Sequence, residues 1–216
     1  MVTTDNNQDL HGNVPDHSSI ALILIDLIND FEFDGAEEIF AHTLAIAQPV
    51  ATLKKKAKLA GVPVIYVNDN FGKWQSDFRK LVDHCLNNNV AGKPIAELLT
   101  PDEQDYFVLK PKHSAFYSTT LDLLLQYLKA KTLILAGITG NICVLFTAND
   151  AYMRDFKLLI PWDCIASAND ADNQYALEQM SKVLKADTRP STEIDFDTIR
   201  KKNRTHRSDH HDNRDV

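Results

Sequence analysis

The chain alternates between short apolar runs and longer segments in which apolar residues recur at helical spacing. A short run of consecutive apolar residues is typical of a strand buried on both faces, whereas helical spacing is typical of an amphipathic helix. The runs predict strands at 19–25, 62–67, 106–109, 132–136 and 158–161, and a sixth, edge strand at 186–192. The helical pattern predicts helices at 36–60, 119–128, 141–153 and 170–184, and a loop with an irregular helix at 68–89. Strands that alternate with helices predict an α/β fold, with a mostly parallel sheet of about six strands and helices on both faces.

The two ends of the chain do not follow this pattern. Residues 1–18 are polar with little apolar content, and residues 195–216 form a charged tail. Both are predicted to be flexible or disordered because they cannot bury a core. Residues 19–194 are therefore predicted to form one domain. The tail contains the histidines His206, His210 and His211. We interpret them as solvated, because no fold fixes the geometry that metal ligands need.

The composition narrows the classes of function. A formal net charge of -7 argues against a general nucleic-acid or membrane-surface binder, since both need a basic face. The apolar runs are far shorter than the roughly 20 residues that span a bilayer, and the N-terminus lacks the features of a signal peptide. Cys85, Cys143 and Cys164 cannot all be paired. We therefore expect a cytoplasmic protein with reduced thiols, whose partner is a small-molecule substrate rather than nucleic acid or a membrane.

Three chemically compatible residues follow three of the predicted strands. Ligands bind outside the carboxyl ends of the strands in an open parallel sheet. Asp26 ends the first strand, Lys110 ends the third, and Cys143 follows the fourth at the start of a helix. A helix N-terminus and a nearby cation lower the pKa of a thiol from about 8.5, and a carboxylate can take its proton. The segment 137–143 offers backbone N–H groups for an oxyanion.

Each of these residues also has a structural interpretation. Cys143 alone is more often a core residue, Asp26 could cap a turn, and Lys110 could be solvated. The three together at three strand ends favour a catalytic interpretation.

The segments 26–31, 108–116 and 137–144 resemble the isochorismatase-like cysteine hydrolases, which include nicotinamidases and N-carbamoylsarcosine amidase. Their order and spacing match over about residues 19–194. The resemblance implies a three-layer α/β/α fold, an Asp26–Lys110–Cys143 triad and a homo-oligomer, either a dimer or a tetramer. It also implies a cis peptide at Ile138–Thr139 and an oxyanion hole formed by the N–H groups of Thr139 and Cys143.

The same resemblance suggests which residues contact the substrate and where the chain departs from the family. Phe31 is expected to line the pocket, and Asn68 and Trp74, at and after the second strand end, are the other substrate-contacting candidates. Nicotinamidases carry an Asp-x-His-x-x-His metal site in this region, but residues 68–74 contain no histidine. We therefore predict no metal and no cofactor.

These features predict a metal-independent hydrolase that cleaves a C–N bond of a small amide or ureide through an acyl-enzyme on Cys143. Two alternatives remain. One is a vinyl-ether hydrolase of the isochorismatase type, in which Asp26 is the acid and Cys143 is a bystander. The other is a catalytically silent binding protein on the same fold.

Overall fold

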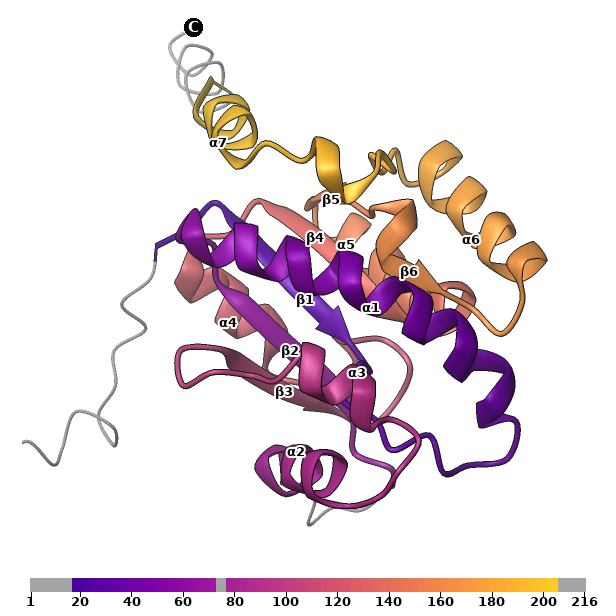
Figure 1. Cartoon of the computed structure of the whole chain (residues 1–216). Helices are drawn as coiled ribbons and strands as arrows, with labels where there is room; N and C mark the ends of the chain where they lie inside the picture. The colour runs from indigo at the N-terminus through magenta and orange to yellow at the C-terminus, as the bar shows by residue number, and fades with distance from the viewer. Residues whose placement is uncertain (1–16, 73–76, 206–216) are drawn as a thin grey trace, which may run out of the picture.

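The computed structural model describes residues 17–72 and 77–205. Its central feature is a parallel sheet with the strand order β3-β2-β1-β4-β5, and β6 pairs with the end of β4 (Figure 1). The strands are β1 Ile20–Ile25, β2 Val64–Asp69, β3 Tyr106–Lys110, β4 Thr132–Ile138, β5 Lys157–Leu159 and β6 Ile165–Ala166. The helices are α1 Ala36–Leu59, α2 Phe78–Asn87, α3 Lys93–Leu98, α4 Leu121–Leu128, α5 Leu145–Tyr152, α6 Asp170–Lys182 and α7 Phe196–Thr205.

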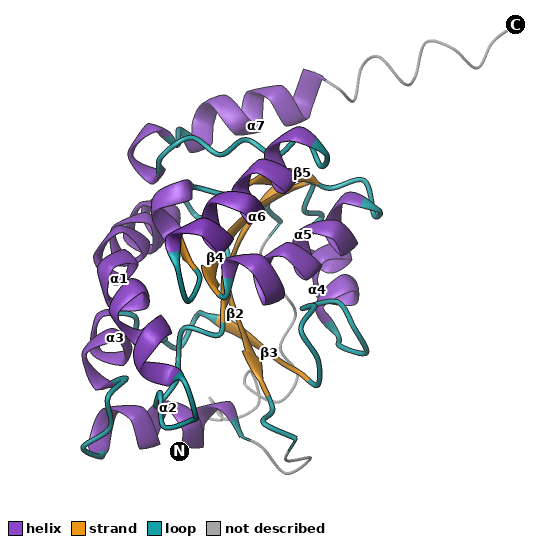
Figure 2. Cartoon of the chain, turned by 90° about the vertical axis from the view of Figure 1, so that its right-hand side faces the viewer, coloured by secondary structure: helices purple, strands orange, loops and turns teal. Residues whose placement is uncertain are grey.

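The two central strands, β1 and β4, explain why continuous apolar runs were a reliable signal. Every residue of both strands is buried, because helices cover both faces of the sheet. Alternate residues of β1 belong to two separate cores. Ile20, Leu22 and Leu24 pack with α1 and α3, whereas Ala21, Ile23 and Ile25 pack with α4, α5 and α6. Figure 2 shows these layers on either side of the sheet, so the predicted three-layer α/β/α architecture is confirmed.

A buried ion pair ties α1 to the loop that precedes β3. Lys54 is a charged residue of α1, yet it is only 9% exposed. Its Nζ lies 2.8 Å from Asp105 Oδ2 and donates to the carbonyl of Thr100 at 2.8 Å. A buried charge is tolerated only where such partners are present.

Two element predictions need correction. The expected edge strand at 186–192 is only an isolated bridge between Leu159 and Asp187, and the sixth strand is β6. A strand of two residues, as β6 is, gives too little pattern to be recognised. The short helix α3 was also not predicted, for the same reason.

The prediction of a disordered tail from residue 195 is wrong for residues 196–205, which form α7. Phe196 and Asn203 are buried, and Ile199 packs against the same core. These positions share one helix face, and this face docks α7 on the sheet. Asn203 Nδ2 donates to Ser19 O at 3.2 Å and to Thr132 Oγ1 at 3.0 Å. The predicted solvated histidines lie outside the described residues.

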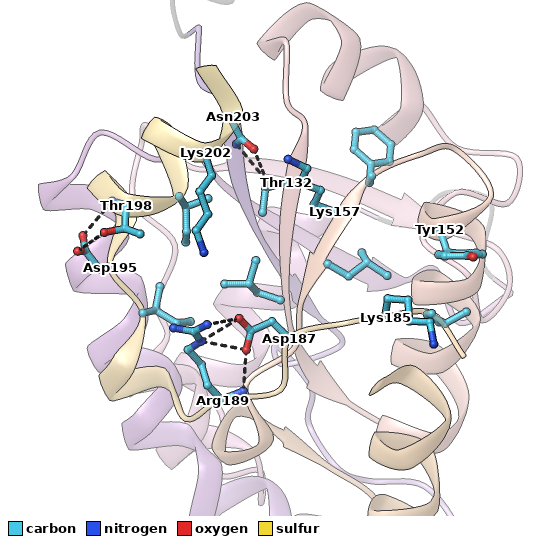
Figure 3. A pocket seen from close by; sticks show the side chains of 16 residues that line it. Thr132, Tyr152, Lys157, Lys185, Asp187, Arg189, Asp195, Thr198, Lys202 and Asn203 are labelled. Carbon is cyan, nitrogen blue, oxygen red and sulfur yellow. Dashed lines mark hydrogen bonds and ion pairs between the residues drawn. The ribbon is translucent and has the colours of Figure 1, made fainter. Parts of the chain in front are cut away.

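A groove of about 580 Å³ lies between α7 and the edge strand β5 (Figure 3). It lies at the opposite end of the strands from Asp26 and Cys143, since Thr132, the first residue of β4, lines it. No helix among the described residues is long and apolar enough to cross a bilayer.

Candidate functional site

The structure brings together the three residues that were predicted to act together. Lys110 Nζ lies 2.9 Å from Asp26 Oδ2 and 3.6 Å from Cys143 Sγ. Lys110 is fully buried, and Asp26 is 8% exposed. The Asp26 carboxylate and the thiol also influence each other's pKa. A carboxylate, an ammonium and a thiol thus share one buried contact at the carboxyl end of the sheet.

The ends of β1 and β4 are shaped to place these groups. Asp26 leaves β1 with a left-handed backbone (φ 53°), a conformation that Asp tolerates better than most residues. Its Oδ1 accepts a hydrogen bond from Asp69 N at 2.8 Å, which fixes the carboxylate. Gly137 is required beside it, because a Cβ at this position would lie 2.1 Å from Ile25 O. Only glycine therefore allows β4 to approach β1 this closely.

The turn before the nucleophile differs from the continuous helix predicted at 141–153. The Ile138–Thr139 peptide is cis, as the family resemblance implied. Gly140–Val144 form a π-helical turn, and α5 begins only at Leu145. Such turns are rare and frequently occur at functional sites.

Side-chain contacts hold this turn in place. Ser167 Oγ accepts a hydrogen bond from Asn141 N at 3.1 Å, and Ser167 Oγ lies 3.1 Å from Asn173 Oδ1. A Cβ at Gly140 would lie 2.4 Å from Asn173 Oδ1, so the turn packs tightly on these side chains. Thr139 O accepts from two N–H groups of the turn, those of Ile142 and Val144. The turn places Cys143 directly before α5, next to Asp26 and Lys110.

Two residues near the triad carried no assigned role from the sequence. Asp69 Oδ2 lies 3.5 Å from Lys110 Nζ, so the ammonium faces two carboxylates. His113 Nδ1 lies 4.0 Å from Cys143 Sγ, and its ring is 5.6 Å from the ring of Phe146. The parallel register, which pairs Asp69 with Lys110, is a signal that could have linked these two residues. The loop position of His113 offered no comparable signal.

The electrostatics of the site depend on burial. Burial raises the pKa of the Asp26 carboxyl, and the neighbouring Lys110 ammonium offsets only part of this effect. Burial acts to lower the pKa of Lys110, but Asp26, Cys143 and Asp69 outweigh it, so the pKa of Lys110 is raised and the side chain is an ammonium. Burial, together with the charge of Asp26, raises the pKa of the Cys143 thiol to about 12. The expected lowering of this pKa is wrong, because Lys110 does not compensate for those two effects.

A cavity of about 420 Å³ opens onto the triad. Asp26, Thr139 and Cys143 form part of its wall, together with Asp69. Its other described lining residues are mostly apolar: Asn29, Phe33, Gly35, Ile39, Phe71, Ile138 and Ala168. Such a lining, apolar with a few polar groups, is typical of a small-molecule site.

The predicted substrate contacts are placed differently. Phe31 is 5% exposed and lies in the core, where its ring is 6.3 Å from that of Phe33; Phe33, and not Phe31, lines the cavity. Asn68 is 1% exposed and its Nδ2 donates to Ile28 O at 2.7 Å, so it stabilises the loop after β1 through a buried hydrogen bond. Strand and loop geometry turns both side chains inward, and substrate contact by Phe31 and Asn68 stays a prediction. Trp74 lies outside the described residues.

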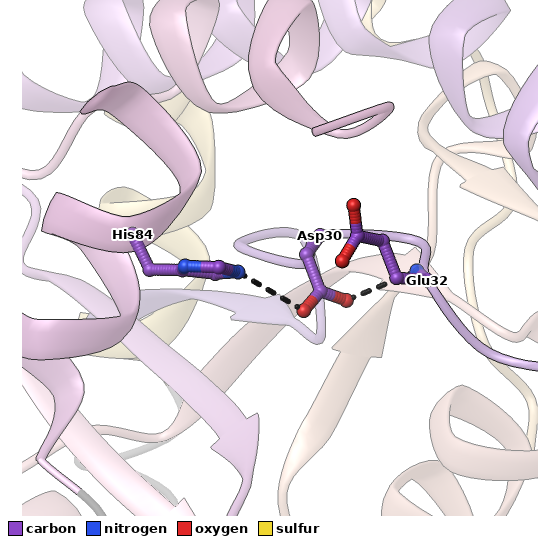
Figure 4. A group of neighbouring side chains, drawn as sticks. All are labelled: Asp30, Glu32 and His84. Carbon is purple, nitrogen blue, oxygen red and sulfur yellow. Dashed lines mark hydrogen bonds and ion pairs between the residues drawn. The ribbon is translucent and has the colours of Figure 1, made fainter. Parts of the chain in front are cut away.

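One group of side chains among the described residues could hold a metal ion, and it is not at the triad. Candidate ligand atoms of Asp30, Glu32 and His84 lie within 4.8 Å of one another (Figure 4). His84 Nε2 is 3.3 Å from Asp30 Oδ2, and Asp30 Oδ1 accepts from Glu32 N. The His84–Asp30 ion pair holds the loop after β1 against α2, and the hydrogen bond from Glu32 N closes a turn in that loop. The group therefore has a structural explanation.

The chain is similar in sequence and fold to known proteins. The profile of the isochorismatase domain matches residues 20–188. The chain is 46% identical to an uncharacterised isochorismatase family protein, YaaI of Bacillus subtilis, over 81% of this chain and 95% of that protein. It is 39% identical to the ureidoacrylate amidohydrolase RutB of Methylorubrum extorquens, over 65% of this chain and 67% of that protein. The solved N-carbamoylsarcosine amidase of Thermoplasma acidophilum is 26% identical, with a TM-score of 0.64 over 82% of this chain and 99% of that one.

Proposed function

The chain belongs to the isochorismatase family of hydrolases, and on that basis we propose that it hydrolyses a C–N bond of a small amide or ureide, with Cys143 as nucleophile. The observation that carries this proposal is the position of Lys110 Nζ, within 2.9 Å of Asp26 and 3.6 Å of Cys143. A buried ammonium that contacts both a thiol and a carboxylate has no obvious structural purpose. The names of two relatives, a ureidoacrylate amidohydrolase and an N-carbamoylsarcosine amidase, also support C–N hydrolysis.

The acylation step follows from the pKa values. At neutral pH the Cys143 thiol is protonated, since its pKa is raised to about 12. The sulfur attacks the substrate carbonyl while its proton passes to Asp26, whose raised pKa makes it a stronger base than an exposed carboxylate. Lys110 balances the negative charge that moves between sulfur and carboxylate. Asp26 then protonates the leaving nitrogen, and the C–N bond breaks.

Hydrolysis of the acyl-enzyme uses the same groups in reverse. Asp26 takes a proton from water, the resulting hydroxide attacks the thioester carbon, and the thiolate leaves and recovers the proton from Asp26. We assign the oxyanion site to the N–H groups of Thr139 and Cys143. Thr139 and Cys143 both line the cavity, and the turn between them is fixed by Ser167. Each such donor contributes about 10²–10³ in kcat in other hydrolases.

The test is to incubate the protein with a panel of small amides and ureides and to search for an acyl adduct by mass spectrometry. We expect the adduct on the peptide that contains Cys143, and its absence in Cys143→Ala. Cys164→Ser is the matched control, since Cys164 is a second free thiol and does not line the cavity. Turnover of the same substrate at the wild-type rate by Cys143→Ala would refute the nucleophile.

The same preparation tests the alternative chemistry. Release of pyruvate from isochorismate that persists after alkylation of Cys143 would support vinyl-ether hydrolysis, with Asp26 as the acid. A silent binding protein would be supported if neither activity were detected and if Cys143 were labelled no faster than the buried Cys85.

A further inference from the structure

Asp69 occupies a position in the site that the triad does not require. Its backbone N–H donates to Asp26 Oδ1 at 2.8 Å, its Oδ1 accepts from Phe71 N at 2.6 Å, and its Oδ2 lies 3.5 Å from Lys110 Nζ. Because Asp26 already neutralises Lys110 at 2.9 Å, a second carboxylate adds a charge that the ammonium does not need. The side chain of Asp69 is 36% exposed, whereas that of Asp26 is 11% exposed. Asp69 is therefore the carboxylate that an incoming ligand meets.

The surroundings of Asp69 define what it can recognise. Among the described residues that line the cavity there is no lysine, arginine or histidine. Lys110 is fully buried behind the two carboxylates, so it is not accessible to a substrate. An ionised carboxylate only accepts hydrogen bonds, so Asp69 favours a substrate with N–H groups near the scissile carbonyl and disfavours one with an acidic or alkyl group there.

The distance to the nucleophile locates those N–H groups. Asp69 Oδ2 and Cys143 Sγ lie 3.5 and 3.6 Å, respectively, from the same atom, Lys110 Nζ, and both residues line the cavity. In the proposed acylation step the leaving nitrogen faces Asp26, which protonates it, so the non-leaving substituent is the one that can face Asp69, the other carboxylate of the cavity wall. In an amide this substituent is carbon, whereas in a urea group it is a second nitrogen that carries hydrogen.

We propose that Asp69 is a specificity-determining residue that accepts a hydrogen bond from the non-leaving nitrogen of a urea group. This inference rests on the proposed C–N hydrolysis and selects ureides over simple amides as its substrates. Attack by Cys143 on the carbamoyl carbon releases the amine R–NH2 and leaves a carbamoyl group on the sulfur. Water then releases carbamic acid, which decomposes to ammonia and carbon dioxide, and the thiol is restored.

A pair of compounds that differ in one group provides the test. Benzylurea and N-benzylacetamide carry NH2 and CH3, respectively, on the non-leaving side of the carbonyl, and both have an aromatic group suited to a cavity that contains Phe33 and Phe71. The measured quantity is the ratio of kcat/KM for the urea to that for the acetamide. We expect Asp69→Leu to lower this ratio about 10- to 150-fold, the factor that corresponds to a hydrogen bond to a charged group.

Two further variants separate recognition from structure. Asp69→Asn retains an oxygen acceptor and is expected to give an intermediate ratio. Glu37→Gln removes an exposed carboxylate outside the cavity and should leave the ratio unchanged. If Asp69 only positions Lys110 or Asp26, its variants will slow both compounds equally, and an unchanged ratio in Asp69→Leu overturns the inference.

A binding measurement distinguishes failure of this inference from failure of the proposed hydrolysis. Calorimetric titration of Cys143→Ala should show tighter binding of benzylurea than of N-benzylacetamide, and this preference should disappear in Cys143→Ala/Asp69→Leu. If neither compound is hydrolysed but the preference in binding is present, the hydrolysis proposal fails and the role of Asp69 stands. If no preference is seen in binding or in turnover, the role of Asp69 is wrong.

Discussion

Replacement of Lys110 by methionine should destabilise the protein and abolish activity, and the two losses should separate in a double variant. Lys110 is fully buried, and its Nζ contacts Asp26 at 2.9 Å. Lys110→Met has a similar shape but leaves the Asp26 carboxylate, itself 8% exposed, without its counter-ion. Removal of one partner of a buried ion pair costs about 3–5 kcal/mol, because the other charge remains desolvated.

The compensating change is Asp26→Asn, which removes the uncompensated charge. We expect Asp26→Asn/Lys110→Met to recover most of the loss, since a buried pair replaced by neutral groups of similar volume is often close to neutral in stability. The recovery will be incomplete, because the amide oxygen can keep the hydrogen bond from Asp69 N but the amide NH2 then replaces Oδ2 and faces the methionine side chain, which offers it only a weak acceptor. Neither variant should hydrolyse substrate.

The free energy of unfolding is measured by urea denaturation, followed by circular dichroism, for wild type, both single variants and the double variant. The pH dependence gives a second check. In Lys110→Met the folded-state pKa of Asp26 is raised by burial without an opposing cation, so the folded state takes up a proton and the destabilisation shrinks as the pH falls. A Lys110→Met protein as stable as wild type at pH 7, or a double variant less stable than both single variants, would refute the ion-pair reasoning.

Three other outcomes can be checked with standard measurements. Gly137→Ala should lower the free energy of unfolding, measured by urea denaturation, by about 2–4 kcal/mol, because its Cβ would lie 2.1 Å from Ile25 O. The control Gly61→Ala should lower it by only about 1–2 kcal/mol, since its Cβ would meet open space and only the φ of 62° is unfavourable. Equal losses in the two variants would contradict the steric argument. Alkylation of Cys143 by iodoacetamide should accelerate about tenfold per pH unit between pH 7 and 10, as its pKa is raised to about 12, whereas a plateau near pH 8.5 would show an ordinary thiol. Phe196→Ala should cost about 3–5 kcal/mol if α7 is docked on the core, and a negligible loss in thermal or urea denaturation would mean that it is not.

The sequence was sufficient to predict the sheet, its layers and the meeting of the triad, because these depend on simple regularities. Fully buried parallel strands appear as continuous apolar runs, and their carboxyl ends share one edge. Asp26, Lys110 and Cys143 could therefore be placed together without coordinates.

The features that were missed depend on contacts that no local pattern encodes. The thiol pKa depends on the balance between burial and two opposite charges, which only distances can decide. The inward orientation of Phe31 depends on the loop backbone, which is left-handed at this residue (φ 57°), and that of Asn68 on which face of β2 it occupies. The buried face of α7 consists of Phe196, Ile199 and Asn203. It was not recognised in the sequence, because Asn203 is polar and the surrounding residues are mostly charged.

The length of the Lys110 side chain links the proposed activity to the register between β2 and β3. Lys110 ends β3, the outermost strand on its side, and its side chain extends past β2 to the carboxylate of β1. Neighbouring strands are about 4.8 Å apart, so a shorter cation could not bridge this gap. A slip of one residue between β2 and β3 would turn Lys110 to the opposite face of the sheet. Catalytic activity is therefore a sensitive reporter of correct strand alignment, and misaligned chains would be silent even if they were compact.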